Sequence, residues 1–306
     1  MIVDEGLLRK LEQLSLVATR VRVGQTAGER RSTKRGTSVE FADYRNYARG
    51  DDLRRVDWNI YARLERPFVK LFEEEEDLAV HILLDGSGSM DWGGESSDPQ
   101  TVDLNKWLYA RRLAAALGYV ALVCGDRLTV VSLQSPVSGS REAGDWRFRP
   151  SRGRGHALRL FSWLEGLEAG GTTDLDAALR NYAVSGGKAG LVVLISDLFS
   201  PAGYLKGVTS LAAAGHEVAV IHMLSPDEVE PPLGGDLRLL DVETGLSQEV
   251  SIDGGMRALY RRRLGEWQDG IRADCRARDV HYISVETGIP YDHVVLYDLR
   301  RAGLAR

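Results

Sequence analysis

Apolar and polar positions change their rhythm near residue 78 of the chain. From there on, short apolar runs alternate with longer stretches in which apolar residues recur at helical spacing. The runs expected to be strands cover residues 78–84, 127–133, 191–195, 217–224 and 280–285, with a short amphipathic strand at 146–149. The stretches expected to be helices cover residues 104–123, 156–168, 175–184 and 203–214. Apolar strands that alternate with helices are typical of a parallel sheet covered on both faces, so we predict an α/β fold with a doubly wound, mostly parallel sheet.

A polar stretch with three prolines interrupts this alternation after residue 224. Beyond it we expect two more strands and two more helices. These strands lie near 237–242 and 247–252, and the helices cover 254–277 and 291–302. We therefore assign residues 78–306 to one α/β domain with a C-terminal extension.

The first part of the chain, residues 1–77, is assigned to a smaller N-terminal module. Leucines and a valine at helical spacing predict an amphipathic helix over 5–22 that packs against another surface. Residues 24–35 are rich in Gly, Ser, Thr and basic residues, which indicates a surface loop.

Residues 40–58 are dense in aromatic residues, arginines and aspartates at irregular spacing. Neither a helical nor a strand period describes them, so we expect side-chain networks to hold this segment. Asp51 or Asp52 is suited to cap a short helix that runs through Trp58. A strand is expected over 66–72, directly before a run of five acidic residues.

Composition and charge narrow the class of protein. The chain is 43% hydrophobic and 27% charged, which is near the average for folded domains and excludes disorder, collagen and coiled coil as its main state. Its 39 basic residues against 44 acidic ones give a net charge of −5, which argues against a nucleic-acid partner. Cys124 and Cys275 lie far apart and outside any C-x-x-C spacing, so a disulfide framework and a thiolate metal site are excluded.

Signals for export or membrane insertion are weak in this sequence. The N-terminus lacks the basic region and cleavage site of a signal peptide. The longest nearly apolar run, residues 113–124, is well short of the roughly 20 residues that span a bilayer. We therefore expect a soluble, cytoplasmic protein without a transmembrane segment.

Short side chains with oxygen atoms stand at three predicted loops. They belong to Asp85, Ser87 and Ser89, to Thr172, Thr173 and Asp174, and to Asp197. Ligands of an open α/β sheet bind at the carboxyl ends of its strands, so we expect these loops to converge there. Oxygen ligands alone suit a hard cation, Mg²⁺ foremost. With two carboxylates, Asp85 and Asp197, the ion keeps much of its charge and can accept an acidic ligand from outside.

The order of these residues resembles the metal-ion-dependent adhesion site of von Willebrand factor type A domains. A D-x-S-x-S sequence runs from Asp85 to Ser89, and a threonine and an aspartate follow downstream. Thr173 matches that site better than Thr172, because members of the family place a leucine two residues on, as Leu175 does here. The resemblance implies Mg²⁺, with Mn²⁺ or Ca²⁺ as alternatives, on Asp85, Ser87, Ser89, Thr173 and Asp197.

A second resemblance covers most of the chain from residue 30 onward. The residues that carry it are Arg35-Gly36, Glu40-Phe41, Tyr44-Arg45, Tyr47, Gly50-Asp51-Asp52, Arg54, Val56-Asp57-Trp58 and Ala62-Arg63. They look like the signature of the bacterial domain-of-unknown-function family fifty-eight, in which this block precedes a type A domain. The resemblance implies an adaptor or assembly factor that works with a MoxR-type AAA+ ATPase. We interpret the block from Glu40 to Arg63 as a structural clamp of Arg–Asp pairs and aromatic residues, and we assign it no catalytic residue.

Three functions are compatible with this pattern, and we favour the first. It is a non-enzymatic module whose bound metal captures an Asp or Glu of a partner protein, namely a MoxR-type ATPase or its client. The alternative is a Mg²⁺-dependent phosphotransferase or hydrolase of haloacid-dehalogenase-like type. Those enzymes use D-x-D, whose second carboxylate carries a proton, whereas Ser87 stands at that position here. The third is a structural scaffold in which the site is empty or serves to fix the loops.

Overall fold

The structure is a computed structural model of the chain. It describes residues 2–18, 40–48, 56–73, 78–94, 102–134, 146–185, 187–232, 234–240 and 247–306. The chain divides into two compact units, of which the larger contains Met1–Gly24 and Leu78–Arg306 and the smaller contains Gln25–Asp77. The larger unit therefore joins the N-terminal segment to the chain beyond residue 77.

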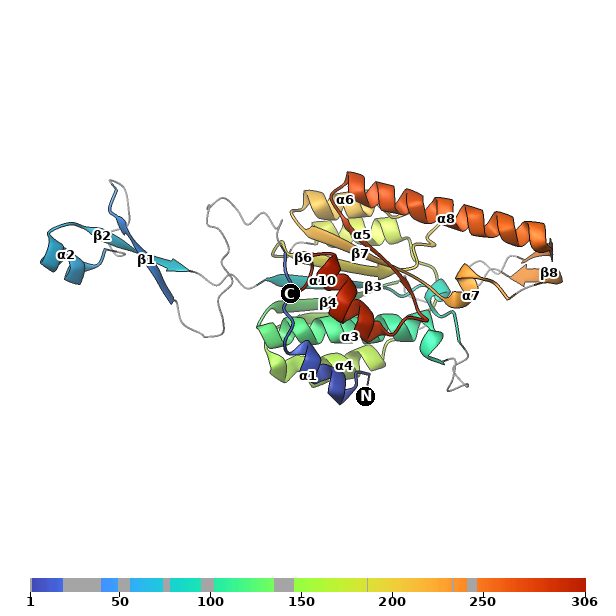
Figure 1. Cartoon of the computed structure of the whole chain (residues 1–306), viewed down its shortest axis with the longest axis horizontal. Coiled ribbons are helices and arrows are strands. Elements are labelled where there is room, and N and C mark those ends of the chain that lie inside the picture. Colours follow the sequence, from blue (N-terminus) through green and yellow to red (C-terminus); the bar gives the residue numbers. More distant parts are fainter. Residues whose placement is uncertain are drawn as a thin grey trace. The chain divides into compact units, whose positions relative to one another are not determined.

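A six-stranded sheet of order β10-β7-β6-β3-β4-β5 forms the centre of the larger unit (Figure 1). Neighbouring strands run parallel, except that β5 pairs antiparallel with β4 at one edge. The strands are β3 (Ala79–Asp85), β4 (Arg127–Leu133), β5 (Arg147–Ser151), β6 (Leu191–Ser196), β7 (Glu217–Leu224) and β10 (His281–Glu286). The prediction of a doubly wound, mostly parallel sheet is confirmed.

Helices cover both faces of this sheet and bury its central strands along their whole length. Every residue of β3, β6 and β7 is buried. One face packs against α3 (Lys106–Cys124), α4 (Ala157–Glu165) and the C-terminal helical segment. The other face packs against α5 (Leu175–Val184), α6 (Leu205–Ala213) and α8 (Gly254–Ala277). Two hydrophobic cores on either side of one sheet are the expected result of strands that are apolar on both faces.

The C-terminal segment is helical from Tyr291 to Arg301, close to the predicted range of 291–302. Its first and last turns are α9 (Tyr291–His293) and α10 (Leu299–Arg301). Between them Val294–Asp298 forms a wider, π-helical turn. Val294, Val295 and Leu299 fill the core beside α3, so the segment closes that face of the sheet.

The N-terminal segment packs with the larger unit, whereas the sequence pattern assigns it to a module at 1–77. Leu7 and Leu11 of α1 (Glu5–Leu11) belong to the same hydrophobic core as α3. The Tyr119 hydroxyl of α3 donates a hydrogen bond of 2.8 Å to Glu12. The predicted module boundary is therefore corrected, because the apolar face of α1 is buried by the α/β domain.

The amphipathic helix predicted over 5–22 is shorter in the structure, since it ends at Leu11. Beyond it the chain turns and pairs with the C-terminal end, where Leu16 and Ala305 form an isolated β-bridge. Leu14 and Leu16 are buried in the same core as the helix. Their apolar spacing therefore reflects burial, but the backbone partners come from the other end of the chain.

In the smaller unit, β1 (Glu40–Asn46) pairs antiparallel with β2 (Phe68–Glu73), and α2 (Trp58–Leu64) lies between them in the sequence. The strand predicted before the acidic run is confirmed as β2. β1 forms in a segment where no strand period was visible, and its register shifts between Phe41 and Asp43. An irregularity of this kind interrupts the alternation on which strand prediction depends.

Helix α2 begins where the sequence pattern predicts a helix to end, at Trp58. Its N-cap is Asp57, whose carboxylate accepts two backbone N–H groups of the first turn. The predicted caps, Asp51 and Asp52, lie outside the described residues. Val56 and Asp57, the described residues of the predicted helix before Trp58, are not helical, so the prediction is wrong there.

A separate antiparallel pair, β8 (Gly235–Leu240) and β9 (Ser247–Ile252), leads into α8. Both strands are predicted from the sequence, and α7 (Pro226–Val229) precedes them.

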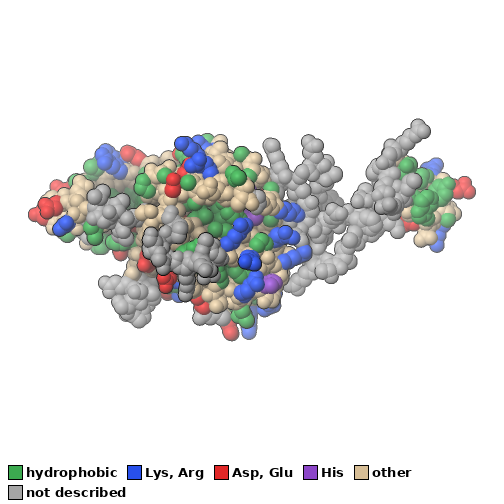
Figure 2. Space-filling view, turned by 180° about the vertical axis from the view of Figure 1, so that it is seen from behind, with side chains coloured by type: hydrophobic (Ala, Val, Ile, Leu, Met, Phe, Trp, Pro, Cys, Tyr) green, Lys and Arg blue, Asp and Glu red, His purple; other side chains and the backbone are tan. Residues whose placement is uncertain are grey.

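At the edge of the main sheet, β5 carries Arg147 and Arg149 at exposed positions. Charged side chains discourage an edge strand from pairing with another chain. Figure 2 shows Lys and Arg side chains gathered over part of the surface.

Candidate metal centre

The two acidic residues of the predicted site lie at the carboxyl ends of neighbouring strands. Asp85 is the last residue of β3, and Asp197 directly follows β6, which pairs with β3. Their side chains are buried, because Asp85 is 2% and Asp197 is 0% exposed. The Ser196 hydroxyl donates a hydrogen bond of 2.5 Å to Asp85 Oδ2 and so joins the two strand ends.

The loop after β3 brings its two serines together. The Ser87 backbone N–H donates to Asp85 Oδ1 at 3.1 Å, and the Oγ atoms of Ser87 and Ser89 also lie 3.1 Å apart. Gly86 leaves room beside this turn, because a Cβ there would lie 2.8 Å from Ser132 Oγ. The hydroxyls of alternate residues therefore meet at one point beside the Asp85 carboxylate.

Thr173 reaches the same place from the loop before α5. Its hydroxyl donates to the Leu133 carbonyl oxygen at 3.1 Å, and the Gly86 N–H donates to that same oxygen at 3.0 Å. The Gly88 N–H donates to the Gly171 carbonyl at 2.9 Å and joins the two loops. A hydroxyl that donates its proton keeps its lone pairs, so Thr173 Oγ1 still has acceptor capacity for a cation.

The structure also separates the two candidate threonines. Thr172 is exposed, whereas Thr173 is 5% exposed and bonded within the convergent loops. The Ser200 hydroxyl, three residues after Asp197, donates to the Thr173 carbonyl oxygen at 3.2 Å. The loops that carry the five predicted residues are therefore linked to one another by hydrogen bonds.

The electrostatics of the site disfavour the charge on Asp85. Burial, and to a smaller extent repulsion by Asp197, raise the pKa of Asp85 from 3.8 to about 6. Hydrogen bonds from Ser196 and Ser87 act in the opposite direction. A divalent cation between two such carboxylates would relieve this repulsion.

Two charged residues that no sequence motif marks, Lys106 and Glu228, lie beside Asp197. Lys106 is the first residue of α3 and is fully buried, with Nζ 2.7 Å from Asp197 Oδ2 and 2.6 Å from Glu228 Oε1. Asp197 Oδ1 accepts the Phe199 backbone N–H at 3.1 Å. In the sequence, Lys106 stands out only as a lysine at the start of a largely apolar helical run. Its position does not indicate a partner such as Asp197, which is 91 residues away.

Aromatic rings form an apolar wall beside this ion pair. Phe199 stacks on Trp267 of α8 with ring centroids 5.2 Å apart, and Lys106 Nζ lies 5.2 Å from the centre of the Phe199 ring. His222 of β7 stands edge-on to Trp267, and burial lowers the pKa of His222 to about 4. The imidazole is therefore neutral at physiological pH and contributes packing rather than charge.

The donor types of the five residues are those of a hard divalent cation. The Oγ atoms of Ser87 and Ser89 are 3.1 Å apart. Adjacent ligands of an octahedral Mg²⁺ are separated by about 2.9 Å. Among the described residues, no three His, Cys, Asp or Glu side chains gather in a group that could hold a metal. A donor set of two carboxylates and three hydroxyls is of a different kind, and it suits Mg²⁺ better than a softer metal.

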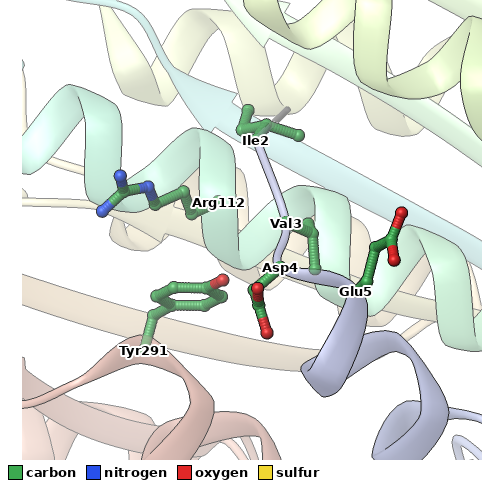
Figure 3. Close-up of a pocket in the computed structure, with 6 residues that line it drawn as sticks. All are labelled: Ile2, Val3, Asp4, Glu5, Arg112 and Tyr291. Atoms are coloured by element: carbon green, nitrogen blue, oxygen red, sulfur yellow. The ribbon is translucent and has the colours of Figure 1, made fainter.

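A shallow hollow of about 350 Å³ lies elsewhere on the larger unit (Figure 3). Figure 3 shows Arg112 of α3 and Tyr291 of the C-terminal segment beside the N-terminal residues. Its full lining is Ile2, Val3, Asp4, Glu5, Arg112 and Tyr291. Asp4 already caps α1 through its carboxylate, so we assign this hollow no chemistry.

Residues 43–268 match the family described as "Protein of unknown function DUF58". The chain belongs to this family. The matched range contains all five residues of the candidate site and most of the block from Glu40 to Arg63. The resemblance seen in the sequence is therefore confirmed for the DUF58 family.

Relatives of this DUF58 chain occur in mycobacteria. An uncharacterized protein of Mycobacterium bovis is 28% identical over 287 residues, which cover 93% of this chain and 86% of the relative. An uncharacterized protein of Mycobacterium tuberculosis has the same identity and coverage. An uncharacterized protein of Mycobacterium avium is 40% identical over 70 residues, which cover 23% of this chain and 41% of the relative.

Two solved structures are distantly similar. The protein BatB from Bacteroides thetaiotaomicron has 15% identity and a TM-score of 0.40, with 74% of this chain and 98% of that chain covered. An aerotolerance-related membrane protein from Bacteroides fragilis has 16% identity, a TM-score of 0.40 and the same coverage. The fold assignment rests on the sheet of the DUF58 chain itself.

Helix α3 is long and apolar enough to cross a membrane by length and composition, and it is the one such helix among the described residues. However, 72% of its apolar window is buried inside the structure. Core helices of water-soluble domains have the same composition. The apolar character of α3 is accounted for by its packing between the sheet, α1 and α4.

Proposed function

We propose that this DUF58 chain is a non-enzymatic protein-interaction module that binds a divalent cation and captures a partner carboxylate through it. The site corresponds to the metal-ion-dependent adhesion site of von Willebrand factor type A domains. Its ligands are Asp85, Ser87, Ser89, Thr173 and Asp197. The observation that carries the proposal is the convergence of three loops that offer two buried carboxylates and a pair of serine hydroxyls 3.1 Å apart.

The charge of the donor set explains why a partner would bind. Two carboxylates balance a divalent cation without adding surplus negative charge, and hydroxyl ligands leave the ion electrophilic. An Asp or Glu side chain of another protein can then replace a water molecule on the metal. A site with carboxylates in place of Ser87 and Ser89 would repel such a ligand.

The metal and the partner follow from the same proposal. Mg²⁺ is the first choice, with Mn²⁺ or Ca²⁺ as alternatives, because all five donors are oxygen atoms. The partner is a MoxR-type AAA+ ATPase or its client, and the support for it is the DUF58 resemblance set out above. We place the interaction in the cytoplasm and expect no nucleic-acid ligand.

The proposal is tested by affinity capture from the native cell with and without EDTA, read by mass spectrometry. We expect a protein that is retained by the wild type in Mg²⁺ and lost both in EDTA and with Asp85→Ala. Asp174→Ser is the matched control, because it removes an exposed carboxylate next to Thr173 and keeps a side chain that can cap α5. Capture that survives both Asp85→Ala and EDTA would refute the proposal.

The alternative of a phosphotransferase or hydrolase requires a proton carrier two residues after Asp85. That position is Ser87, whose hydroxyl is within hydrogen-bond distance of Ser89. A serine hydroxyl does not exchange its proton readily at neutral pH. Mg²⁺-dependent phosphatase activity on a small-molecule panel, lost in Asp85→Asn, would favour this alternative over the binding module.

A further inference from the structure

Lys106 is buried at a position where two separate effects oppose a positive charge. Its side chain is 0% exposed, and lysine is almost never fully buried unless it is paired. It is also the first residue of α3, where the positive end of the helix dipole repels a cation. Its contacts with Asp197 and Glu228 offset these costs, so the ammonium group is placed to act on the Asp197 carboxylate.

Glu228 gives the ammonium group a second partner that does not depend on Asp197. Glu228 Oε1 lies 2.6 Å from Nζ, and Oε2 accepts the Ser225 N–H at 2.8 Å. The Ser225 hydroxyl in turn accepts the Glu228 N–H, which completes the capping box of α7. Glu228 is thus fixed by local structure, and it can hold Lys106 when Asp197 turns to another cation.

We propose that Lys106 is a resident counter-ion that competes with the divalent metal for Asp197 and so lowers the affinity of the site. Glu228 holds the ammonium group when the metal is bound. This inference rests on the proposed function, because it concerns the same site. It makes Lys106 and Glu228 positioning residues that set the metal concentration at which the site fills.

The proposal predicts changes of opposite sign from two neighbouring substitutions. Lys106→Met removes a positive charge beside Asp197, so Mg²⁺ should bind at least about tenfold more tightly, which is the effect of a unit charge about 6 Å from a divalent ion even in bulk water. Glu228→Gln leaves Lys106 bound to Asp197 alone, so Mg²⁺ should bind about threefold or more weakly. The double variant Lys106→Met/Glu228→Gln should bind Mg²⁺ about threefold more tightly than the wild type, between the two single variants.

Isothermal titration calorimetry with MgCl₂ measures these affinities on the full chain. Circular dichroism and thermal unfolding in EDTA show which variants fold. If Lys106→Met does not fold, Glu228→Gln and the double variant still test the inference. Lys206→Met is the control for the loss of one positive charge, because Lys206 is exposed on α6.

The outcomes separate this inference from the proposed function. Tighter binding in Lys106→Met and weaker binding in Glu228→Gln support it. Weaker or unchanged Mg²⁺ binding in a folded Lys106→Met overturns the inference, and so does tighter or unchanged Mg²⁺ binding in Glu228→Gln. In either case, Mg²⁺ binding by the wild type leaves the proposed function standing. Binding in Lys106→Met but not in the wild type supports the competition and refutes the metal-dependent function. Binding in neither protein refutes both.

Discussion

Substitution of Asp85 by Asn should stabilise the metal-free protein and abolish its response to Mg²⁺. The Asp85 carboxyl is 2% exposed, and burial together with repulsion by Asp197 raises its pKa from 3.8 to about 6. A carboxyl that binds its proton more tightly in the folded chain than in the unfolded chain favours the fold at low pH. Its contribution to stability therefore falls as the pH rises from about 4 to about 6, and the full cost is present above that range.

The magnitude follows from the shift in pKa. A difference of about 2 pKa units corresponds to a cost of about 3 kcal/mol for the ionised carboxylate in the fold. Asparagine removes the charge but keeps the shape, and it loses one of the two acceptor oxygens that bond to Ser87 and Ser196. That loss costs about 1–2 kcal/mol. The net gain is about 1–2 kcal/mol, or a rise in Tm of about 2–8 °C for a domain of this size.

Thermal and urea unfolding in EDTA at pH 8 and at pH 4 check this result. We expect Asp85→Asn to be more stable than the wild type at pH 8 and to lose that advantage at pH 4. With free Mg²⁺ at about 100 times its Kd, the wild type should gain about 2.7 kcal/mol and Asp85→Asn nothing. Asp174→Asn, at an exposed cap, is the matched control and should change neither value. A variant that is no more stable than the wild type at pH 8 would refute the reasoning.

Three further predictions concern the body of the larger unit. Gly207→Ala should destabilise the protein by about 1–3 kcal/mol in urea unfolding, because its Cβ would lie 2.5 Å from Leu179 Cβ. The control Gly265→Ala in α8 meets no atom within 4 Å and should raise the free energy of unfolding by about 0.5–1 kcal/mol. Equal effects of the two substitutions would contradict this packing. Leu117→Ala, fully buried in α3, should cost about 2–5 kcal/mol in the same assay, and a smaller loss would show that the core collapses onto the cavity. Burial lowers the pKa of His81 from 6.5 to about 4, so its neutral form favours the fold, and up to about 3 kcal/mol should be lost as the pH falls from 6.5 to 4. His81→Gln should flatten that part of the stability profile, and an unchanged slope would assign it to other groups.

Several elements of the larger unit could be predicted because their buried residues form apolar patterns within the element itself. The predicted ranges of α5, β7 and α8 agree with the structure to the residue. The strand run of β7 is buried on both faces, and α8 begins at the cap Asp253 and ends near Arg278. Each of these signals lies within the element itself, so no distant contact was needed to interpret it.

Elements that depend on remote partners could not be predicted in the same way. The chain after α1 pairs with residues near the C-terminus, and the leucine spacing alone suggested a longer helix. β1 has a register shift against β2, which hides the strand period. At the site, the loop positions of Asp85 and Asp197 followed from the ends of their strands. Lys106 and Glu228, which are 122 residues apart, left no pattern that joins them.

Buried charge at the ends of β3 and β6 is hard to explain by stability. Asp85, Asp197, Glu228 and Lys106 carry three negative charges against one positive charge, so the cluster has a surplus of two negative charges. Buried ion pairs rarely stabilise a fold more than apolar residues of the same size. A divalent cation would balance the surplus. Binding of a cation at this site can therefore restore stability that the buried negative charges cost. Both stabilisation by Asp85→Asn without metal and tighter Mg²⁺ binding by Lys106→Met would report the excess of negative charge in this cluster.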